Sequence, residues 1–111
     1  MKNFSPVTRN RDFKRIFNKG SSIVTPYFVV YYLNSKSDTT KISIIASKKI
    51  GNAVVRNRCR RIVKAALLFH IPELAKSCEI VIVIRKRCFF AKSNFIGSLI
   101  FKVFSENGLI I

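Results

Sequence analysis

The chain has 111 residues, with 21 Lys and Arg against 5 Asp and Glu, so its formal net charge at pH 7 is +16. Hydrophobic residues make up 49% of the sequence and aromatic residues 12%, which is too apolar for a disordered basic tail and predicts one folded domain over residues 1–111. Charge of this density opposes compaction, so the composition disfavours a small-molecule enzyme and favours a polyanionic partner, nucleic acid before an anionic membrane surface.

Residues 9–18 predict a short helix. Thr8 or Asn10 can cap its start, and Gly20 can end it. The apolar residues of its inner face recur at helical spacing: Phe13, Ile16 and Phe17. The charged residues near the N-terminus interrupt any run of signal-peptide length, so we expect a cytoplasmic, reduced protein.

Two β-type segments follow the first helix. Residues 27–33 are aromatic and β-branched, residues 41–47 alternate, and a polar stretch over 34–40 separates them. This arrangement predicts an antiparallel hairpin. Because proline cannot donate to a sheet ladder, Pro26 is expected at the beginning or at a bend of the first strand.

The main helix is predicted over residues 53–69, with Asn52 as its N-cap after Gly51 and Pro72 beyond its end. Apolar positions are expected to share one narrow arc: Val55, Cys59, Ile62, Ala66 and Phe69. The opposite side is polar: Arg56, Asn57, Arg60, Arg61 and Lys64. One side of this helix should pack, and the other should be solvated or bound.

The last third of the chain predicts a buried central strand over residues 79–85 and a helix capped by Ser93 or Asn94, with Gly108 at its end. The helix carries five apolar residues: Phe95, Leu99, Ile100, Val103 and Phe104. The element order α-β-β-α-β-α predicts a two-layer α+β sandwich with a central mixed sheet. The second and third strands should be parallel and joined across the main helix in a β-α-β crossover.

Catalysis by protein side chains has little support. The three cysteines form no CxxC pair, the single histidine has no ligand spacing around it, and the five acidic residues fall on separate predicted elements. No glycine-rich phosphate-binding motif is present in the sequence. We therefore expect no metal, no cofactor and no catalytic residue in the protein.

Basic residues are instead concentrated between Thr39 and Pro72, where no acidic residue occurs. Lys48 and Lys49 lead into the N-terminus of the main helix, whose free backbone N–H groups also favour phosphates. Asn57 can reach base edges or 2′-hydroxyls. A merely solvated basic helix face is the alternative, but repeated like charges at i,i+4 destabilise a free helix and favour binding.

Aromatic residues allow two interpretations. Phe13 and Phe17 of the first helix, with the tyrosines of the first strand, could form a platform on which unpaired bases stack. They could equally belong to the core, and the residues alone leave both possibilities open.

Residues 47–61, Ser-Lys-Lys-Ile-Gly-Asn-Ala-Val-Val-Arg-Asn-Arg-Cys-Arg-Arg, resemble the signature of the bacterial ribonuclease P protein subunit. The resemblance extends to Asp12-Phe13 through Phe17 with Gly20, to the aromatic strand and to Arg85-Lys86, and so spans most of the chain. It implies a protein that joins a catalytic RNA, one to one, in removing 5′ leaders from precursor tRNAs. The RNA, with Mg²⁺, would perform the hydrolysis that leaves a 5′-phosphate.

The resemblance also implies two RNA-binding surfaces, with no DNA or membrane partner. The residues expected to bind the catalytic RNA are Lys48, Lys49, Asn52, Arg56, Asn57, Arg58, Arg60, Arg61 and Lys64. The residues expected to line a cleft for the leader are Phe13, Phe17, Tyr31, Lys14, Arg85 and Lys86. The implied fold has a left-handed β-α-β crossover, like the second domain of ribosomal protein S5, against the usual right-handed rule.

Two rival classes share the composition. A ribosomal or other structural RNA-binding protein would have the same size and charge, and only the Arg-Asn-Arg signature argues against it. A membrane-surface protein would need an exposed apolar helix face, which the sheet is expected to cover here. The segment Arg87-Cys88-Phe89-Phe90 departs from the family pattern by its apolar character, and no function is indicated for it.

Overall fold

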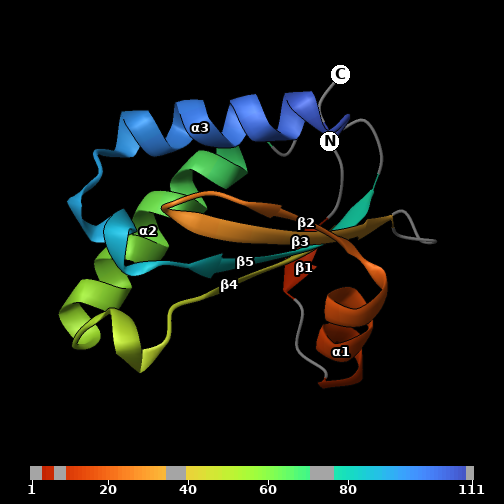
Figure 1. Ribbon diagram of the computed structural model, residues 1–111, viewed down its shortest axis with the longest axis horizontal. Coiled ribbons are helices and arrows are strands. Elements are labelled where there is room, and N and C mark those ends of the chain that lie inside the picture. The colour runs from red at the N-terminus through yellow and green to blue at the C-terminus, as the bar shows by residue number, and fades with distance from the viewer. Residues whose placement is uncertain (1–3, 7–9, 35–39, 71–76, 110–111) are drawn as a thin grey trace.

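The computed structural model describes residues 4–6, 10–34, 40–70 and 77–109. Its elements, in chain order, are β1 (Phe4–Pro6), α1 (Asn10–Lys19), β2 (Ser21–Val24), β3 (Phe28–Asn34), β4 (Thr40–Ile45), η1 (Lys48–Ile50), α2 (Ala53–His70), β5 (Cys78–Ile84), η3 (Lys86–Phe90) and α3 (Ser93–Glu106). Helices α2 and α3 lie on one side of the sheet and α1 lies on the other (Figure 1). The predicted α+β class is confirmed, with the main elements placed to within two residues of their predicted bounds.

The sheet has five strands in the order β1-β4-β5-β3-β2. Strand β5 is parallel to β4 and antiparallel to β3. The predicted antiparallel hairpin between residues 27–33 and 41–47 is therefore wrong, because β5 lies between β3 and β4. The most apolar strand takes the centre, where both of its faces are covered, and alternation along a strand does not indicate its neighbours. Strands β1 and β2 were not predicted.

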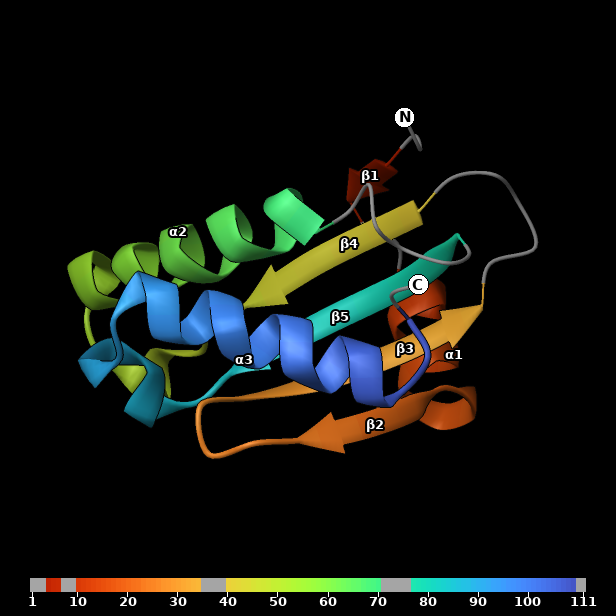
Figure 2. The ribbon, with the colours of Figure 1, turned by 90° about the horizontal axis from the view of Figure 1, so that it is seen from above.

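The connection from β4 through α2 to β5 is the predicted crossover between parallel strands. In Figure 2 α2 and α3 lie on the viewer's side of the sheet, β4 and β5 both point to the left, and β5 lies below β4. This is a left-handed crossover, against the strong right-handed preference of such units. The end of β4 and the start of α2 are joined by η1 and lie at the same end of the molecule.

The main core lies between the sheet and the pair α2 and α3. Its fully buried members come from both layers: Phe28, Val30, Ile80, Ile82, Cys59, Val63, Ile96, Ile100 and Phe104. Within α2 the buried row is Cys59, Val63 and Leu67, so the predicted arc is rotated. Phe69, expected in the core, is 74% exposed, and Phe95 of α3 is 46% exposed.

Two predicted helix caps differ in the structure. Helix α1 begins at Asn10, which is therefore its first residue, and Thr8 lies outside the described residues. Helix α3 begins at Ser93 with Lys92 at the cap, whose side chain makes no capping hydrogen bond, and Asn94 lies inside the first turn, where its Oδ1 accepts from the Phe95 N–H at 2.9 Å. Pro72, predicted to end α2, also lies outside the described residues.

Gly20 allows α1 to end directly against the sheet. Its N–H donates to the Ile16 carbonyl at 2.9 Å, which closes the helix. A Cβ at this position would lie 2.5 Å from the Ile16 oxygen and 2.6 Å from the Tyr32 oxygen. Only glycine fits this approach. The predicted end of the helix at Gly20 is confirmed, and so is a chain turn at Pro26, where β2 turns into β3.

Candidate nucleic-acid interface

The sequence between β4 and α2 builds an exposed helix start. Gly51 has φ +156°, and a Cβ on it would lie 3.0 Å from Cβ and Cγ1 of Val55, so the turn requires glycine. The Val55 N–H then donates to Oδ1 of Asn52 at 3.1 Å. This confirms Asn52 as the N-cap and leaves the helix end open toward solvent.

The structure brings the residues predicted to bind the catalytic RNA onto α2 and its approach. We call this set the α2 cationic face: Lys48, Lys49, Asn52, Arg56, Asn57, Arg58, Arg60, Arg61 and Lys64. All are exposed except Arg56 and Arg60, which are half-buried. Arg60 donates to Oδ1 of Asn57 at 3.1 Å and to the Ala46 carbonyl at 3.3 Å, so its guanidinium is held in place.

The cations of this face have no acidic partners within the described residues. The ion pairs among the described residues involve only Asp12, Arg15, Lys41 and Glu79, which lie on the opposite side of the sheet. A run of arginines without carboxylates keeps its donors available for phosphate oxygens. Side chains of Val54, Asn57, Arg60, Arg61 and Lys64 surround a shallow hollow of about 610 Å³ on this face. Its chemistry suits a polyanion.

The predicted leader cleft has an aromatic part on the α1 side of the sheet. We call Phe13, Phe17 and Tyr31 the α1 ledge. The ring centroids of Phe17 and Tyr31 lie 4.8 Å apart at right angles, and those of Phe13 and Phe17 lie 6.3 Å apart, nearly parallel. Phe17 is 40% exposed, and Phe13 and Tyr31 are half-buried, so the ledge is part core and part surface. Lys14 lies exposed on the same helix.

Arg85 and Lys86 do not join this ledge. Tyr31 pairs with Val81 in the sheet, whereas Arg85 follows the far end of β5, about 13 Å further along at the usual rise per residue. Arg85 donates to the Thr25 carbonyl at 3.2 Å. These two cations lie at the end of the sheet where β4 leads into Lys48. The α1 side of β3 and β5 connects the two groups.

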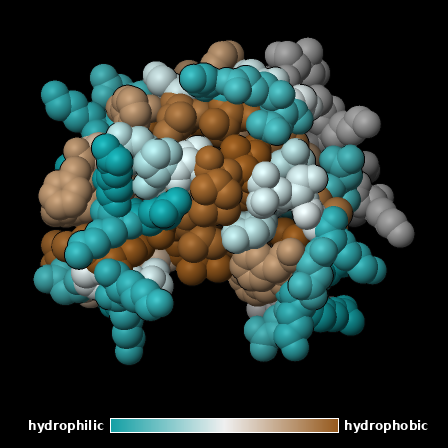
Figure 3. Space-filling model, viewed as in Figure 1, coloured by the Kyte–Doolittle hydropathy of each residue, from teal (hydrophilic) through white to brown (hydrophobic). Residues whose placement is uncertain are grey.

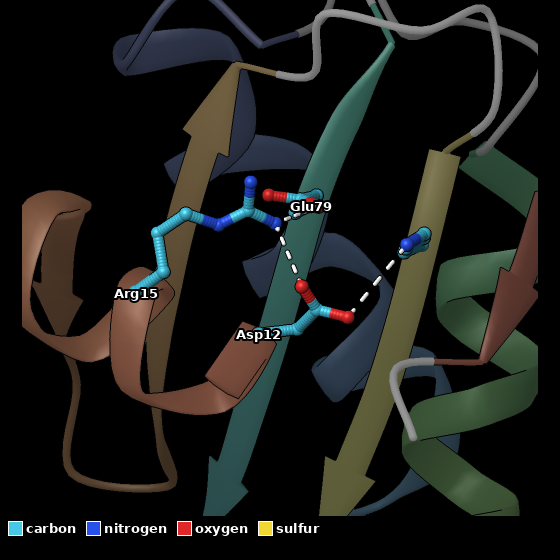
Figure 4. Close-up of polar contacts among 4 residues, drawn as sticks. Asp12, Arg15 and Glu79 are labelled. Atoms are coloured by element: carbon cyan, nitrogen blue, oxygen red, sulfur yellow. Dashed lines mark hydrogen bonds and ion pairs between the residues drawn. The ribbon is translucent and has the colours of Figure 1, made fainter. Parts of the chain in front are cut away.

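An ion-pair network on the α1 side was missed by the sequence analysis, which treated the acidic residues as scattered. Arg15 donates to Oδ1 of Asp12 at 3.2 Å and also to Oε1 of Glu79, which is 5% exposed (Figure 4). Lys41 lies 3.8 Å from Oδ2 of Asp12. The i,i+3 spacing of Asp12 and Arg15 was the available signal, but only the sheet register brings Glu79 to them.

The buried thiols of Cys59 and Cys88 meet where α2 packs on η3. Burial raises the pKa of both, that of Cys88 to about 12, with the neighbouring Cys59 thiol raising it further. Protonated thiols are poor nucleophiles. Cys59 is buried on the core side of α2, as predicted.

Within the described residues no helix is long and apolar enough to cross a membrane. The same part of the chain holds no group of three or more His, Cys, Asp or Glu side chains that could bind a metal ion.

The chain is similar to proteins of one family. The family model "Ribonuclease P" matches residues 1–105. The ribonuclease P protein component of Bacillus cereus strain B4264 is 36% identical over 110 residues, covering 98% of this chain and 96% of the relative. The structure of the Staphylococcus aureus RNase P protein superposes with a TM-score of 0.84 at 29% identity, covering 96% of this chain and 97% of that one. That of Thermotoga maritima superposes at 0.78 with 24% identity, covering 88% and 93%, and supports the fold. The chain therefore belongs to the ribonuclease P protein family, whose members act in tRNA processing.

Proposed function

We propose that this protein, as one domain and in a one-to-one complex, binds the catalytic RNA of ribonuclease P and the 5′ leader of precursor tRNA. The observation that carries the proposal is the α2 cationic face, a row of cations without described acidic partners at a capped helix start. Membership of the family supplies the RNA partner. The protein then promotes endonucleolytic removal of the leader, which leaves a 5′-phosphate on the mature tRNA.

The catalytic RNA binds at the α2 cationic face. Exposed arginines such as Arg58 and Arg61 contact phosphates, with Arg60 held in place beside them. The open N-terminus of α2 adds its N–H groups and partial positive charge next to Lys48 and Lys49. Asn57 accepts a hydrogen bond from Arg60 and keeps its amide N–H groups for the RNA.

The leader binds on the other side of the sheet. Its unpaired bases stack on the α1 ledge, where Phe17 is accessible and Tyr31 supports it edge-on. The RNA leader then runs along the α1 side of β3 and β5 toward Arg85 and Lys86, near the start of α2. Stacking and backbone charge accept varied base sequences, as a leader-binding surface must.

Hydrolysis belongs to the RNA subunit, which supplies the Mg²⁺ sites, and the protein contributes no catalytic residue. The role of its cations is to reduce repulsion between two polyanions and so to raise the affinity of the RNA for precursor. Each neutralised phosphate adds roughly 0.7–0.9 to the slope of log affinity against log salt. We therefore expect the protein to matter most near physiological salt and less at very high magnesium.

The test is cleavage of precursor tRNA by a bacterial ribonuclease P RNA at low magnesium and near-physiological salt, with and without this protein. Stimulation that grows with a leader of several nucleotides, and is lost when the leader is shortened to one nucleotide, supports both surfaces. Binding of unrelated structured RNA with equal affinity, without stimulation, contradicts the proposal and indicates a structural RNA-binding protein such as a ribosomal one.

A further inference from the structure

Exposed aromatic rings and cations gather where η3 meets α3. Phe90 is 77% exposed and Phe95 is 46% exposed. Tyr27 lies edge-on to Phe95 with ring centroids 5.1 Å apart, and the Arg87 guanidinium lies 5.6 Å from the Tyr27 centroid. These residues, with Ala91 and Lys92, surround a hollow of about 400 Å³. We call Tyr27, Arg87, Phe90, Lys92 and Phe95 the η3 corner.

The core does not account for the two exposed rings. Within η3, Cys88 is fully buried against Cys59, and the chain then turns Phe90 outward. In α3, Ile96 is fully buried, while the side chain of its neighbour Phe95 is about half exposed to solvent. An aromatic ring in water is unfavourable unless a partner covers it. The positive charges beside the rings indicate the chemistry of that partner.

The η3 corner is continuous with the α2 cationic face. The Arg58 guanidinium lies 5.9 Å from the centroid of Phe89, and the Phe89 ring lies 5.3 Å from that of Phe90. The corner lies at the end of the molecule where α2 starts, and the α1 ledge lies on the other side of the sheet. Apolar side chains bordered by hydrophilic ones are visible at this end in Figure 3.

We propose that the η3 corner binds an unpaired nucleotide of the catalytic RNA. This inference rests on the proposed function and extends the α2 cationic face by one subsite. The base stacks on the exposed face of Phe90 or Phe95, and the adjacent phosphates contact Arg87 and Lys92. A hollow of about 400 Å³ suits one base among aromatic walls. The catalytic RNA is the source, because the Arg58 guanidinium of its binding face lies over the Phe89 ring beside Phe90. The aromatic rings of the leader surface lie on the other side of the sheet, and only the end of that surface, at Arg85 and Lys86, comes near the corner.

A tryptophan at position 90 tests the stacking directly, because the chain contains no Trp and the new ring is the only indole. We expect Phe90→Trp to bind the catalytic RNA at least as tightly as the unchanged protein, with fluorescence quenched at one RNA per protein. Phe101→Trp is the matched control. Phe101 lies on the same helix as Phe95 with the same 46% exposure, in a groove lined by uncharged side chains. Equal quenching at both positions, or none at position 90, overturns the inference.

Affinity gives a second measurement. Phe90→Ala, through the loss of one stacked base, and Arg87→Ala, through the loss of a phosphate contact, should each weaken binding of the catalytic RNA roughly tenfold, while Phe101→Ala should not. Quenching of Phe90→Trp by precursor tRNA alone would overturn the assignment to the catalytic RNA. Failure of the unchanged protein to bind that RNA contradicts the proposed function itself. If the unchanged protein binds the catalytic RNA and Phe90→Ala and Arg87→Ala bind it with the same affinity, only the proposed nucleotide site at the η3 corner is contradicted.

Discussion

The two sides of the sheet are built differently. The side under α2 and α3 is closed by apolar packing, with Phe28, Ile82 and Phe104 fully buried. The side under α1 has one short helix, and Ile16 and Val81 are its fully buried apolar residues in the described part of the chain. The acidic residues with ion pairs lie on this thinner side. The cations of α2, on the outside of the thicker side, have no described acidic partners.

This difference separates stability from binding in two ways. On the α2 and α3 side, the apolar core holds the fold and leaves the outer surface of α2 exposed, where the proposed RNA contacts lie. Under the proposed function, the same residues of the α1 side have both roles, because Phe17 and Tyr31 pack the helix on the sheet and also present their rings. Substitutions on the α1 side should therefore affect stability and leader binding together, whereas those on the α2 cationic face should affect RNA binding alone.

The largest effect is expected where α1 is closest to the sheet. Gly20→Ala places a Cβ within 2.6 Å of two backbone oxygens and should lower the free energy of unfolding by about 3 kcal/mol. Gly97→Ala is the control, since its Cβ would lie 3.8 Å from Ala66 and alanine favours a helix. Urea denaturation measures both. Equal stability of the two variants would show that α1 adjusts its position freely.

The second effect concerns the ion-pair network of the α1 side. Glu79→Gln removes the buried charge that faces Arg15 and should lower the free energy of unfolding by about 1–2 kcal/mol, a modest cost because the Arg15 side chain is 42% exposed. Glu106→Gln, on the exposed surface of α3, should change little. Thermal unfolding in low salt compares them. An equally large loss of unfolding free energy in Glu106→Gln would mean that the net charge of the protein, and not the ion-pair network, determines the effect on stability.

The sequence predicted the elements whose pattern is local. The caps and turns at Asn52, Gly20 and Pro26 were found because each residue type has its own backbone or hydrogen-bonding reason to be there. The central position of β5 was predicted from its continuous apolar run, but its insertion between β3 and β4 was not, because alternation along a strand does not indicate its neighbours. The short strand β2 lacked a sufficient run of apolar residues, so periodicity gave no signal for it.

Site residues followed the same division. The α2 cationic face was predictable because charge without acids at helical spacing is a sequence property. The distance between Arg85 and the α1 ledge was not, because it depends on the sheet register. Phe69 was assigned to the core from its place on the predicted apolar arc of the main helix, but the sheet and α3 cover a rotated face of α2, whose buried residues are Cys59, Val63 and Leu67.

The third effect is the separation of the two RNA surfaces. Arg61→Ala should weaken binding of the catalytic RNA roughly tenfold and leave thermal stability unchanged, because Arg61 is exposed. Phe17→Leu keeps an apolar side chain on the ledge but removes the stacking ring, so it should weaken precursor binding by the assembled enzyme several-fold and spare assembly.

Binding titrations of each RNA separate these two outcomes. Lys102→Ala, an exposed cation of α3 outside both surfaces, serves as the control for net charge alone. If Arg61→Ala and Phe17→Leu lowered both affinities to the same degree, the two surfaces would not be independent. If Lys102→Ala matched Arg61→Ala, overall charge would replace the α2 cationic face as the explanation.

The smallest effect is a pH dependence on the α2 and α3 side. Burial raises the pKa of Cys88 to about 12 from 9.0, so the folded protein retains a proton that the unfolded chain releases. Stability from this group is complete well below pH 9, the pKa in the unfolded chain, and is lost as the pH rises toward 12, by about 0.7 kcal/mol between pH 8.5 and 9.5. Cys88→Ala removes that contribution, so its free energy of unfolding should fall less steeply over this interval. Parallel curves for the two proteins would show that the Cys88 thiol ionises as readily in the folded state, and that η3 opens to water more easily than its packing against Cys59 indicates.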